Sequence, residues 1–448
     1  MRTQLPTPVQ AFTHPRLLAR LAAAASLAAV AGCTDSPPLT TATAPVAAAS
    51  RGVTPAYAIR DLQGDLGAAG FVGVFGVFDV NNAGDVAGSA VTTAGGQHAF
   101  RWSQGQALDI GTLGGFDPML NSQAAGRTSG RVLSIVSDIT TLDPLQEDFC
   151  GLGSTYICRA AVWRDGVMLP LPTLGGNNAA ALTMNTNGQL IGLAEDGVLD
   201  NSCMAPQQSH FQAASWENGA IRKLDPLPGD EVAMALRNND NDQIVGTSGL
   251  CSNTFYGGFG IGAHAVLWDH GSPVALGSLG GAGGSLAAGI NNRGDVIGAS
   301  SAADGTLHPF LWTKASGMRD LGLLSADPAD AANTPFQVNN RGQMVGSSCD
   351  ATLTFCRGYL WQDGAFQDIN DLIPASANLY VIVPLTINDA GQIGGLALDL
   401  TTFDLRAFVA TPSGNAVGGA HRGPAAGSVP LPATARAQLR RQLGPRRR

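Results

Sequence analysis

Tryptophan recurs at one position of a repeated unit, and this repeat restricts the fold more than any other feature of the chain. The six tryptophans each follow a short strand-like run and stand 44 to 61 residues apart. They are Trp102, Trp163, Trp216, Trp268, Trp312 and Trp361. A further short run follows each of them, such as the Met-Arg-Asp-Leu-Gly sequence of 318–322. Short apolar runs at this regular spacing predict strands rather than a helical repeat.

A turn signal precedes the tryptophan run in most units. It begins with Asn and ends with Gly, as in 81–84, 185–188, 291–294, 339–342 and 388–391. Asn followed by a closing Gly suits a type I turn that ends in a residue with positive φ. The fourth copy has Asp242 at the Gly position, and the second copy, around Asn121, lacks two turn residues. Each unit therefore predicts four short strands.

Seven such units predict an all-β fold, a seven-bladed β-propeller of four-stranded antiparallel blades. The seventh unit stops after its third strand, at 406–410, and an extra copy of the missing strand stands at 59–62, before the first unit. We expect this N-terminal strand to complete the last blade and close the ring, which leaves no half-made blade with an unpaired edge. An open array would carry polar capping units at its ends, and the sequence shows none.

The repeat resembles that of the HAF repeat family of extracellular bacterial proteins. The resemblance covers about residues 56–412 and rests on the Asn-Asn-x-Gly turn, a Gly-ended strand, the run 98–102 (His-Ala-Phe-Arg-Trp) and a Leu-Gly-x-Leu-Gly-Gly sequence. The third unit departs from it, with Gln-Ala-Ala-Ser-Trp at 212–216. The resemblance implies an exported β-rich repeat protein, and it implies no catalytic residue.

The two ends of the chain predict segments outside the fold. Residues 1–32 carry three arginines, no acid and a short apolar run, which is typical of a signal peptide. The run Val30-Ala31-Gly32-Cys33 resembles the lipobox of bacterial lipoproteins, in which the cysteine receives a lipid. The alternative is an ordinary signal peptide with a chance cysteine. We expect lipidation of Cys33, a flexible tether over 33–55, the propeller over 56–412, and a disordered basic tail over 413–448.

Charge argues against a nucleic-acid partner. The chain carries 26 basic and 34 acidic residues, for a net charge of −8. Ten of the basic residues lie in the signal and the tail, whereas all the acids lie in between, so the body has a net charge of −18. Such an acidic body would repel the phosphate backbone. We expect an exported protein on the cell envelope, at the outer membrane, with a lipid anchor as its contact with the membrane.

The cysteines predict disulfides. Besides Cys33 there are six, and an even number in an exported chain favours pairing. All six fall between the second and third strands of their units. We expect the pairs Cys150–Cys158 and Cys349–Cys356 within single loops, and Cys203–Cys251 between neighbouring blades.

No cofactor or metal is predicted. The chain lacks a phosphate-binding loop, a nucleophile elbow and a zinc His-Glu-x-x-His sequence. His98, His264 and His308 recur once per unit, which favours a structural role. The spacing of Asn238, Asp240 and Asp242 faintly resembles a calcium loop, but it lacks the distal Glu. The preference of Asn and Asp for turns explains this spacing better, and bound calcium is the alternative.

Function is most reasonably sought where the repeats differ. The loops between the second and third strands are long in blades two to four, near 128–156, 195–211 and 248–263. They carry acids (Asp138, Asp143, Glu147, Asp148, Glu195 and Asp196) and aromatics, and the aromatics form the candidate binding rim: Phe149, Tyr156, Phe255, Tyr256 and Phe259. Exposed aromatics on braced loops suit recognition, although the loops are equally compatible with tolerated insertions.

We therefore expect a non-catalytic binding or scaffolding propeller with a protein or polysaccharide ligand. The alternative is a carbohydrate-active enzyme, and it would need two carboxylates about 5 to 10 Å apart in the channel. A purely structural envelope protein is the third possibility, and it predicts no saturable ligand.

Overall fold

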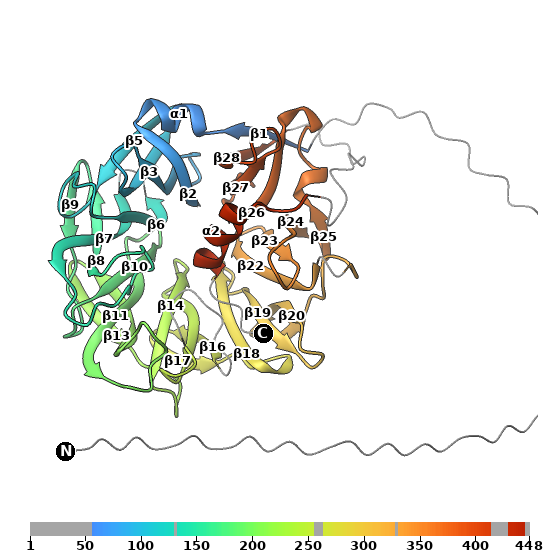
Figure 1. Ribbon diagram of the computed structural model, residues 1–448. Coiled ribbons are helices and arrows are strands. Elements are labelled where there is room, and N and C mark those ends of the chain that lie inside the picture. Colours follow the sequence, from blue (N-terminus) through green and yellow to red (C-terminus); the bar gives the residue numbers. More distant parts are fainter. Residues whose placement is uncertain (1–55, 130–131, 255–262, 328–329, 414–428, 444–448) are drawn as a thin grey trace, which may run out of the picture. The chain divides into compact units, whose positions relative to one another are not determined.

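The repeated turn and strand signals fold as antiparallel sheets, and the computed structural model is all-β apart from a few short helices (Figure 1). The structure describes residues 56–129, 132–254, 263–327, 330–413 and 429–443. Strands that follow one another in sequence pair in order as antiparallel hairpins within each sheet, and the one exception is the pairing of β1 with β28. The prediction of four short strands per unit is confirmed.

The first four sheets each contain four consecutive strands. Sheet 1 contains β2 (Phe71–Val80), β3 (Val86–Thr92), β4 (Gln97–Ser103) and β5 (Gln106–Gly111), and sheet 2 contains β6 (Ser122–Ser129), β7 (Val132–Leu142), β8 (Tyr156–Arg164) and β9 (Val167–Pro170). Sheet 3 contains β10 (Ala179–Met184), β11 (Leu190–Leu199), β12 (Ser209–Glu217) and β13 (Ala220–Leu224), and sheet 4 contains β14 (Val232–Asn238), β15 (Gln243–Gly249), β16 (His264–Asp269) and β17 (Ser272–Ala275).

The remaining strands repeat this pattern. Sheet 5 contains β18 (Gly280–Ile290), β19 (Val296–Ala302), β20 (Leu307–Thr313) and β21 (Gly317–Asp320), and sheet 6 contains β22 (Ala332–Val338), β23 (Met344–Cys349), β24 (Cys356–Gln362) and β25 (Ala365–Asp368). A single parallel bridge between Leu307 and Ala332 joins sheets 5 and 6. Sheet 7 contains β26 (Leu379–Ile387), β27 (Ile393–Asp399) and β28 (Leu405–Pro412), together with the N-terminal strand β1 (Tyr57–Asp61).

The N-terminal strand lies where the sequence placed it. β1 is antiparallel to β28, with Ile59 opposite Ala410 and Asp61 opposite Phe408. The short helix α1 (Gln63–Ala68) then leads from β1 to β2 of sheet 1. The first and last strands of the described sheets therefore share one sheet.

The turn of the second unit is not where the sequence placed it. Asn121 stands before β6, which runs on to Ser129, and β7 begins at Val132, so the connection between these two strands includes residues 130–131, which lie outside the described residues. The Asn121 side chain instead accepts a hydrogen bond from Gln97 N, at 3.0 Å, and so contacts sheet 1. The sequence placed this turn too early because the second unit has no Asn-x-x-Gly sequence to mark where its first two strands meet.

A bulge in the first strand of most sheets meets a glycine in the second. In sheet 4 the register shifts between Ala235 and Arg237, opposite Gly246. A Cβ added at Gly246 would lie 1.9 Å from the carbonyl oxygen of Met234, which no side chain tolerates. The bulge and the glycine together let the two strands approach closely.

Two of the tryptophans pack at the junctions between neighbouring sheets. Trp216 and Trp268 have no exposed surface, and Trp216 packs against Ala160 and Leu171 of the preceding sheet. Trp216 Nε1 donates to Pro172 O at 2.9 Å, and Trp268 Nε1 donates to Asp225 O at 2.7 Å. Both acceptors lie on the connection that arrives from the preceding sheet, so each indole fixes one junction.

The prediction of a disordered tail over 413–448 is wrong for residues 429–443. Residues 433–443 form the helix α2 (Ala433–Leu443), and Leu431, Ala435 and Leu439 are buried in one hydrophobic cluster with residues of β2 and β26. Gln438 Nε2 donates to Val74 O and Phe75 O of β2, at 3.0 and 2.8 Å. Apolar residues four apart place one stripe of the helix against the sheets. No helix among the described residues is long and apolar enough to cross a membrane.

All three predicted disulfides are present. Cys150 pairs with Cys158, Cys349 pairs with Cys356, and Cys203 of sheet 3 pairs with Cys251 of sheet 4. Disulfides persist in oxidising compartments, and these are therefore compatible with an exported protein.

Candidate functional site: a polar cavity between two turns

The Asn-initiated turns are built by their own side chains. In sheet 3, Asn185 Oδ1 accepts from Asn187 N and from Gln189 N, at 3.1 and 3.0 Å. Gly188 then closes the turn with a φ of +83°, a conformation that favours glycine. Sheet 4 repeats the turn with Asp242 at this position, at a φ of +54°. Asp tolerates the left-handed region better than most residues, so the departure from Gly leaves the turn intact and adds a carboxylate.

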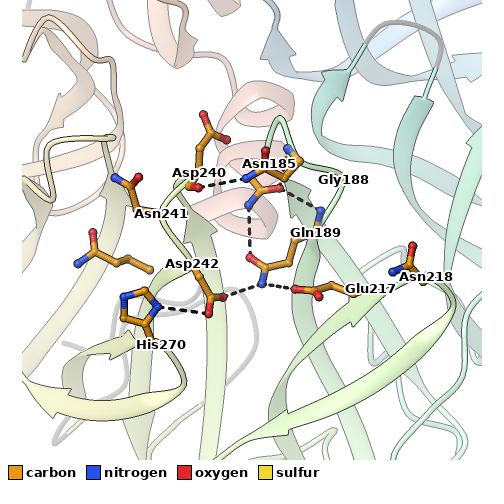
Figure 2. A pocket seen from close by; sticks show the side chains of 11 residues that line it. Asn185, Gly188, Gln189, Glu217, Asn218, Asp240, Asn241, Asp242 and His270 are labelled. Carbon is orange, nitrogen blue, oxygen red and sulfur yellow. Dashed lines mark hydrogen bonds and ion pairs between the residues drawn. The ribbon is translucent and has the colours of Figure 1, made fainter.

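A cavity of about 610 Å³ lies between these two turns. Its lining is polar throughout and comes from the turns of sheets 3 and 4 and from the hairpins after β12 and β16 (Figure 2). The lining residues that carry charge or titrate are Glu217, Asp240, Asp242 and His270. No aromatic residue belongs to the lining, so recognition here depends on hydrogen bonds and charge.

Gln189 holds the acidic side of the cavity in place. Its Nε2 donates to Glu217 Oε1 at 2.6 Å and to Asp242 Oδ1 at 2.8 Å, as Figure 2 shows. His270 Nδ1 lies 3.6 Å from the other oxygen of Asp242. Gln189 is buried whereas Glu217 and His270 are exposed, so a fixed amide positions groups that face solvent.

The third turn residue beside this cavity is shorter than its counterparts in sheets 5 and 6. This residue is Asn187 in sheet 3 and Asn241 in sheet 4, but Arg293 in sheet 5 and Arg341 in sheet 6. Arg293 reaches into the next turn, where its Nη1 donates to Asn340 O. The corresponding cavity between sheets 5 and 6 is only about 220 Å³. Comparison of the turn sequences would have found this difference, but only the structure shows that the residue faces the neighbouring sheet.

The predicted aromatic rim is not supported where the structure describes it. Phe149 is buried with 3% of its surface exposed, and it packs with Val136, Leu152 and Phe211. Tyr156 is half-buried at the start of β8. Phe255, Tyr256 and Phe259 lie outside the described residues. The loop after β7 therefore folds inward around its disulfide and packs in one hydrophobic cluster with residues of sheets 2, 3 and 4.

The acids of the long loops are also buried, and they serve as hydrogen-bond acceptors. Asp138, Asp143, Glu147 and Glu195 each have 2% or less of their surface exposed. Glu147 Oε1 accepts from Gln208 N and Ser209 N, and Glu195 Oε2 accepts from Asn177 N and Asn178 N. Burial, a hydrogen bond to Glu195 and the charge of Glu195 raise the pKa of Glu147 to about 8. These carboxylates brace the loops from within.

The recurring histidines have a structural partner in their own sheets. His98 Nδ1 lies 3.0 Å from the carboxylate of Asp109, and His308 Nδ1 lies 2.9 Å from that of Asp320. Each pair joins the third and fourth strands of one sheet, which explains why both residues recur in the repeat.

A second cavity contains residues from six of the first strands. It measures about 20 Å³ and is lined by residues of β2, β6, β10, β14, β18 and β22. Asp79 is the only carboxylate among the described residues of this lining. The cavity is too small for a sugar, and it offers no carboxylate pair for the predicted enzyme.

Comparisons with known proteins find weak structural similarity only. No family model matches the chain, and no curated protein matches it. A puromycin-hydrolyzing peptidase of Mycobacterium tuberculosis is 13% identical over 63% of this chain and 42% of its own, with a TM-score of 0.38. TolB from Acinetobacter baumannii is 11% identical over 74% and 64%, with a TM-score of 0.38. The BP39L lectin from Burkholderia pseudomallei is 11% identical over 81% and 100%, with a TM-score of 0.42.

This chain spans less than two thirds of the peptidase and of TolB. Matches of this strength carry no argument about function, and the resemblance to the HAF repeat family stays a prediction from the sequence.

Proposed function

We propose that the sheets close into a seven-bladed β-propeller. The main support is a chain of hydrogen bonds in which the turn Asn of one sheet donates to the turn carbonyl of the next. Its members are Asn185 to Asn239 O, Asn239 to Asn291 O, Asn291 to Asn339 O, Asn339 to Asn388 O and Asn388 to Asn81 O, at 2.7 to 3.3 Å. The last bond joins sheet 7 to sheet 1, and Val80 N also donates to Thr386 Oγ1 at 3.2 Å.

Sheet 2 completes the proposed ring through other groups. Ala99 N of sheet 1 donates to Ser122 Oγ of sheet 2, and Cys158 N of sheet 2 donates to Asn178 Oδ1 of sheet 3. The small cavity lined by six of the first strands is what a common axis would produce. The axis would then be filled by side chains and leave no open channel.

Ring closure predicts that the junction between sheets 7 and 1 is as strong as an internal one. Asn388→Asp keeps the oxygen that builds the turn but removes the donor to Asn81 O, and Asn339→Asp makes the same change between sheets 6 and 7. Both side chains are buried. We expect each variant to lose about 1 to 3 kcal/mol of unfolding free energy, measured by urea denaturation. A loss for Asn339→Asp with none for Asn388→Asp would favour an open array.

We propose further that the protein is a non-catalytic binding module for a hydroxyl-rich or amino-sugar polysaccharide, which it takes in the cavity between sheets 3 and 4. The cavity volume carries this proposal, because about 610 Å³ falls in the range of small-ligand sites. Carboxylate and amide oxygens accept hydrogen bonds from sugar hydroxyls and ammonium groups. The same carboxylates would repel an anionic polysaccharide.

Filling the cavity with the residue that the repeat itself uses should abolish binding. We expect chitosan or glucan oligosaccharides to raise the melting temperature of the full chain carrying Cys33→Ser, and alginate oligosaccharides to leave it unchanged. A ligand at a hundred times its Kd adds about 2.7 kcal/mol. Asn187→Arg should remove the shift, because Arg occupies this turn position in sheets 5 and 6.

Ala390→Arg makes the matched change in the turn of sheet 7 and should leave the shift intact. An unchanged shift in Asn187→Arg would exclude the cavity as the site. The absence of a shift with every oligosaccharide would favour a protein partner or a purely structural role.

The location of the protein is also proposed. Cys33 lies outside the described residues, and its lipidation rests on the sequence pattern alone. A lipid at Cys33 would hold the propeller on the cell envelope and present the cavity to its polymers. Incorporation of radiolabelled palmitate that Cys33→Ser abolishes is the measurement that checks the anchor.

A further inference from the structure

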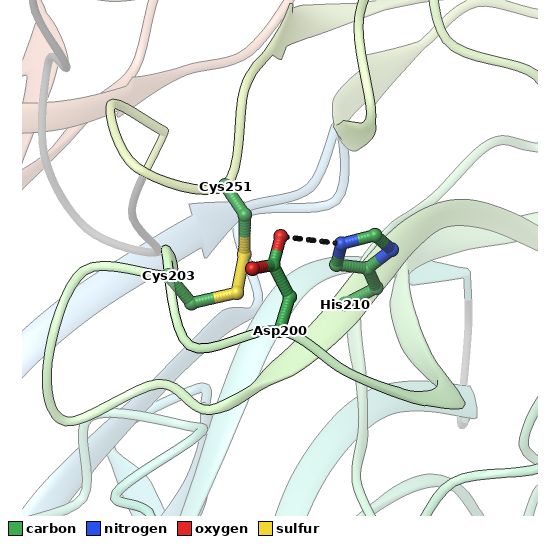
Figure 3. A group of neighbouring side chains, drawn as sticks. All are labelled: Asp200, Cys203, His210 and Cys251. Atoms are coloured by element: carbon green, nitrogen blue, oxygen red, sulfur yellow. Dashed lines mark hydrogen bonds and ion pairs between the residues drawn. A yellow bond between two sulfur atoms is a disulfide. The ribbon is translucent and has the colours of Figure 1, made fainter.

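Four side chains of the types that bind metal ions lie together at the disulfide that joins sheets 3 and 4. Asp200 follows β11, His210 lies in β12, and Cys203 and Cys251 form the disulfide between them (Figure 3). One ligand atom of each lies within 4.8 Å of the ligand atoms of the other three. His210 Nε2 and Asp200 Oδ2 are 2.9 Å apart. Among the described residues, this is the one such group of three or more.

The backbone holds these residues together independently of the sulfur–sulfur bond. Cys203 N donates to Asp200 O at 3.1 Å, which closes a turn within the loop. Met204 N donates to Cys251 O at 3.1 Å, and this bond joins the loops of sheets 3 and 4. Glu231 Oε2 accepts from Cys251 N at 3.1 Å. The two sulfurs would therefore remain neighbours after reduction.

The group has the composition of a zinc site. Two thiolates, one imidazole nitrogen and one carboxylate oxygen supply four ligands of the kinds that Zn²⁺ takes in tetrahedral sites. Cys251 is buried, whereas the other three side chains are half-buried, so an ion could enter and then be enclosed. In the disulfide form the sulfurs are not thiolates, and only His210 and Asp200 could bind.

We propose that this disulfide is a redox-gated metal site, which binds Zn²⁺ when it is reduced and releases the ion when it is oxidised. A two-electron reductant such as a dithiol supplies two electrons and two protons, the bond between Cys203 Sγ and Cys251 Sγ breaks, and the dithiol becomes a disulfide. Zn²⁺ then displaces the two thiol protons into solvent and bonds to both sulfurs, His210 Nε2 and Asp200. Oxidation by a disulfide reverses both steps.

Co²⁺ is the probe for this proposal, because its absorption distinguishes tetrahedral thiolate coordination. The full chain carrying Cys33→Ser is reduced with a phosphine, which adds no thiol, and titrated with Co²⁺. We expect thiolate charge-transfer and tetrahedral d–d bands at one ion per chain in the reduced protein only, and their loss when Zn²⁺ is added.

Two substitutions separate this site from the other reduced cysteines. His210→Gln removes a ligand and should weaken Co²⁺ binding by more than the ~10-fold that loss of an outer-shell partner costs. His308→Gln removes a histidine with a similar carboxylate partner far from any cysteine in sequence, and it should leave binding unchanged. Bands of equal strength in His210→Gln, or in a Cys203→Ser/Cys251→Ser variant, would overturn the proposal.

Stability supplies a second readout, because reduction alone can weaken the fold. Zn²⁺ should raise the melting temperature of the reduced chain and leave that of the oxidised chain unchanged. A reduced chain that loses its β-sheet circular dichroism and does not regain it with Zn²⁺ would also overturn the proposal.

Discussion

Asp330→Ala should lower the free energy of unfolding by about 3 to 5 kcal/mol, the cost of breaking a buried ion pair by removing one partner. Asp330 has no exposed surface, and it accepts from Arg357 Nε at 3.0 Å and also from Arg357 Nη2. Ser325 Oγ and Ser348 Oγ donate to its two oxygens as well. Its removal leaves the Arg357 guanidinium group with Asp368 as its remaining carboxylate partner, and it leaves the Ser325 hydroxyl group without its acceptor.

The pKa of Asp330 indicates the same interaction. Burial by itself raises the pKa, but hydrogen bonds from Arg357 and the two serines outweigh it and hold the pKa below its ordinary value. Because the folded pKa is depressed, this stabilisation is present above the pKa of the unfolded chain and is lost as pH falls through the folded value. The effect of Asp330→Ala should therefore be full at pH 7.

The exposed pair in sheet 5 provides the control for urea denaturation. Asp320 pairs with His308 but is 43% exposed, so Asp320→Ala should cost less than about 1 kcal/mol. Equal small losses for Asp330→Ala and Asp320→Ala would contradict the prediction.

Glu147→Gln should stabilise the protein in alkaline solution by up to about 4 kcal/mol. Glu147 is fully buried, and burial with the neighbouring Glu195 raises its pKa from 4.5 to about 8. A raised folded pKa means that stability is full below the unfolded pKa and falls as pH rises toward 8. Above pH 8 the wild type holds two facing carboxylates, whereas Gln stays neutral and can donate to Glu195.

Denaturant midpoints at pH 6.5 and pH 9 test this prediction. The wild type should lose stability between the two values and Glu147→Gln should lose little. This window avoids Asp138, whose pKa burial raises to only about 6. Glu217→Gln changes an exposed carboxylate and should leave the wild-type slope unaltered. The same slope in Glu147→Gln as in the wild type would show that Glu147 is ionised in the folded protein at pH 6.5.

The sequence predicted the sheets because each unit repeats both its turn and its packing residue. The Asn-initiated turn fixes where the first two strands meet, and the tryptophan marks the third. Each signal lies within a few residues of the strands that it marks, and the repeated sequence presents both signals several times. The hydrogen bonds between neighbouring turns also depend on these asparagines. Nothing in the sequence of a single unit indicates that the side-chain amide of its turn Asn reaches the next sheet.

The long loops could not be predicted from the sequence in the same way. An aromatic residue in a polar loop suits a binding surface and a hydrophobic core equally well, and Phe149 is buried because the loop between β7 and β8 packs against sheets 2 to 4. Glu147 and Glu195 were expected on the same face as the rim, yet they are enclosed because each accepts backbone hydrogen bonds. These partners lie far along the chain, so composition does not reveal them.

Two further features were visible in the sequence but not interpreted. The spacing of Leu431, Ala435 and Leu439 is that of one helix face, but the surrounding arginines favoured a solvated tail. Asn at the third turn position in two copies, with Arg in the next two, marks the cavity. The copies of the repeat differ in their turns as well as in their loops, and the turns carry the proposed site.

The pairing of β1 with β28 has a consequence for the synthesis of the chain. The first strand to emerge from the ribosome is the last to find its partner, because β28 is translated after every other strand. Until then β1 has no sheet, and β26 and β27 form an incomplete one. Helix α2, translated later still, then contacts the backbone of β2. The last sheet is therefore completed by the strand that was translated first. A chain truncated before β28 would leave β1 without a partner and the last sheet incomplete.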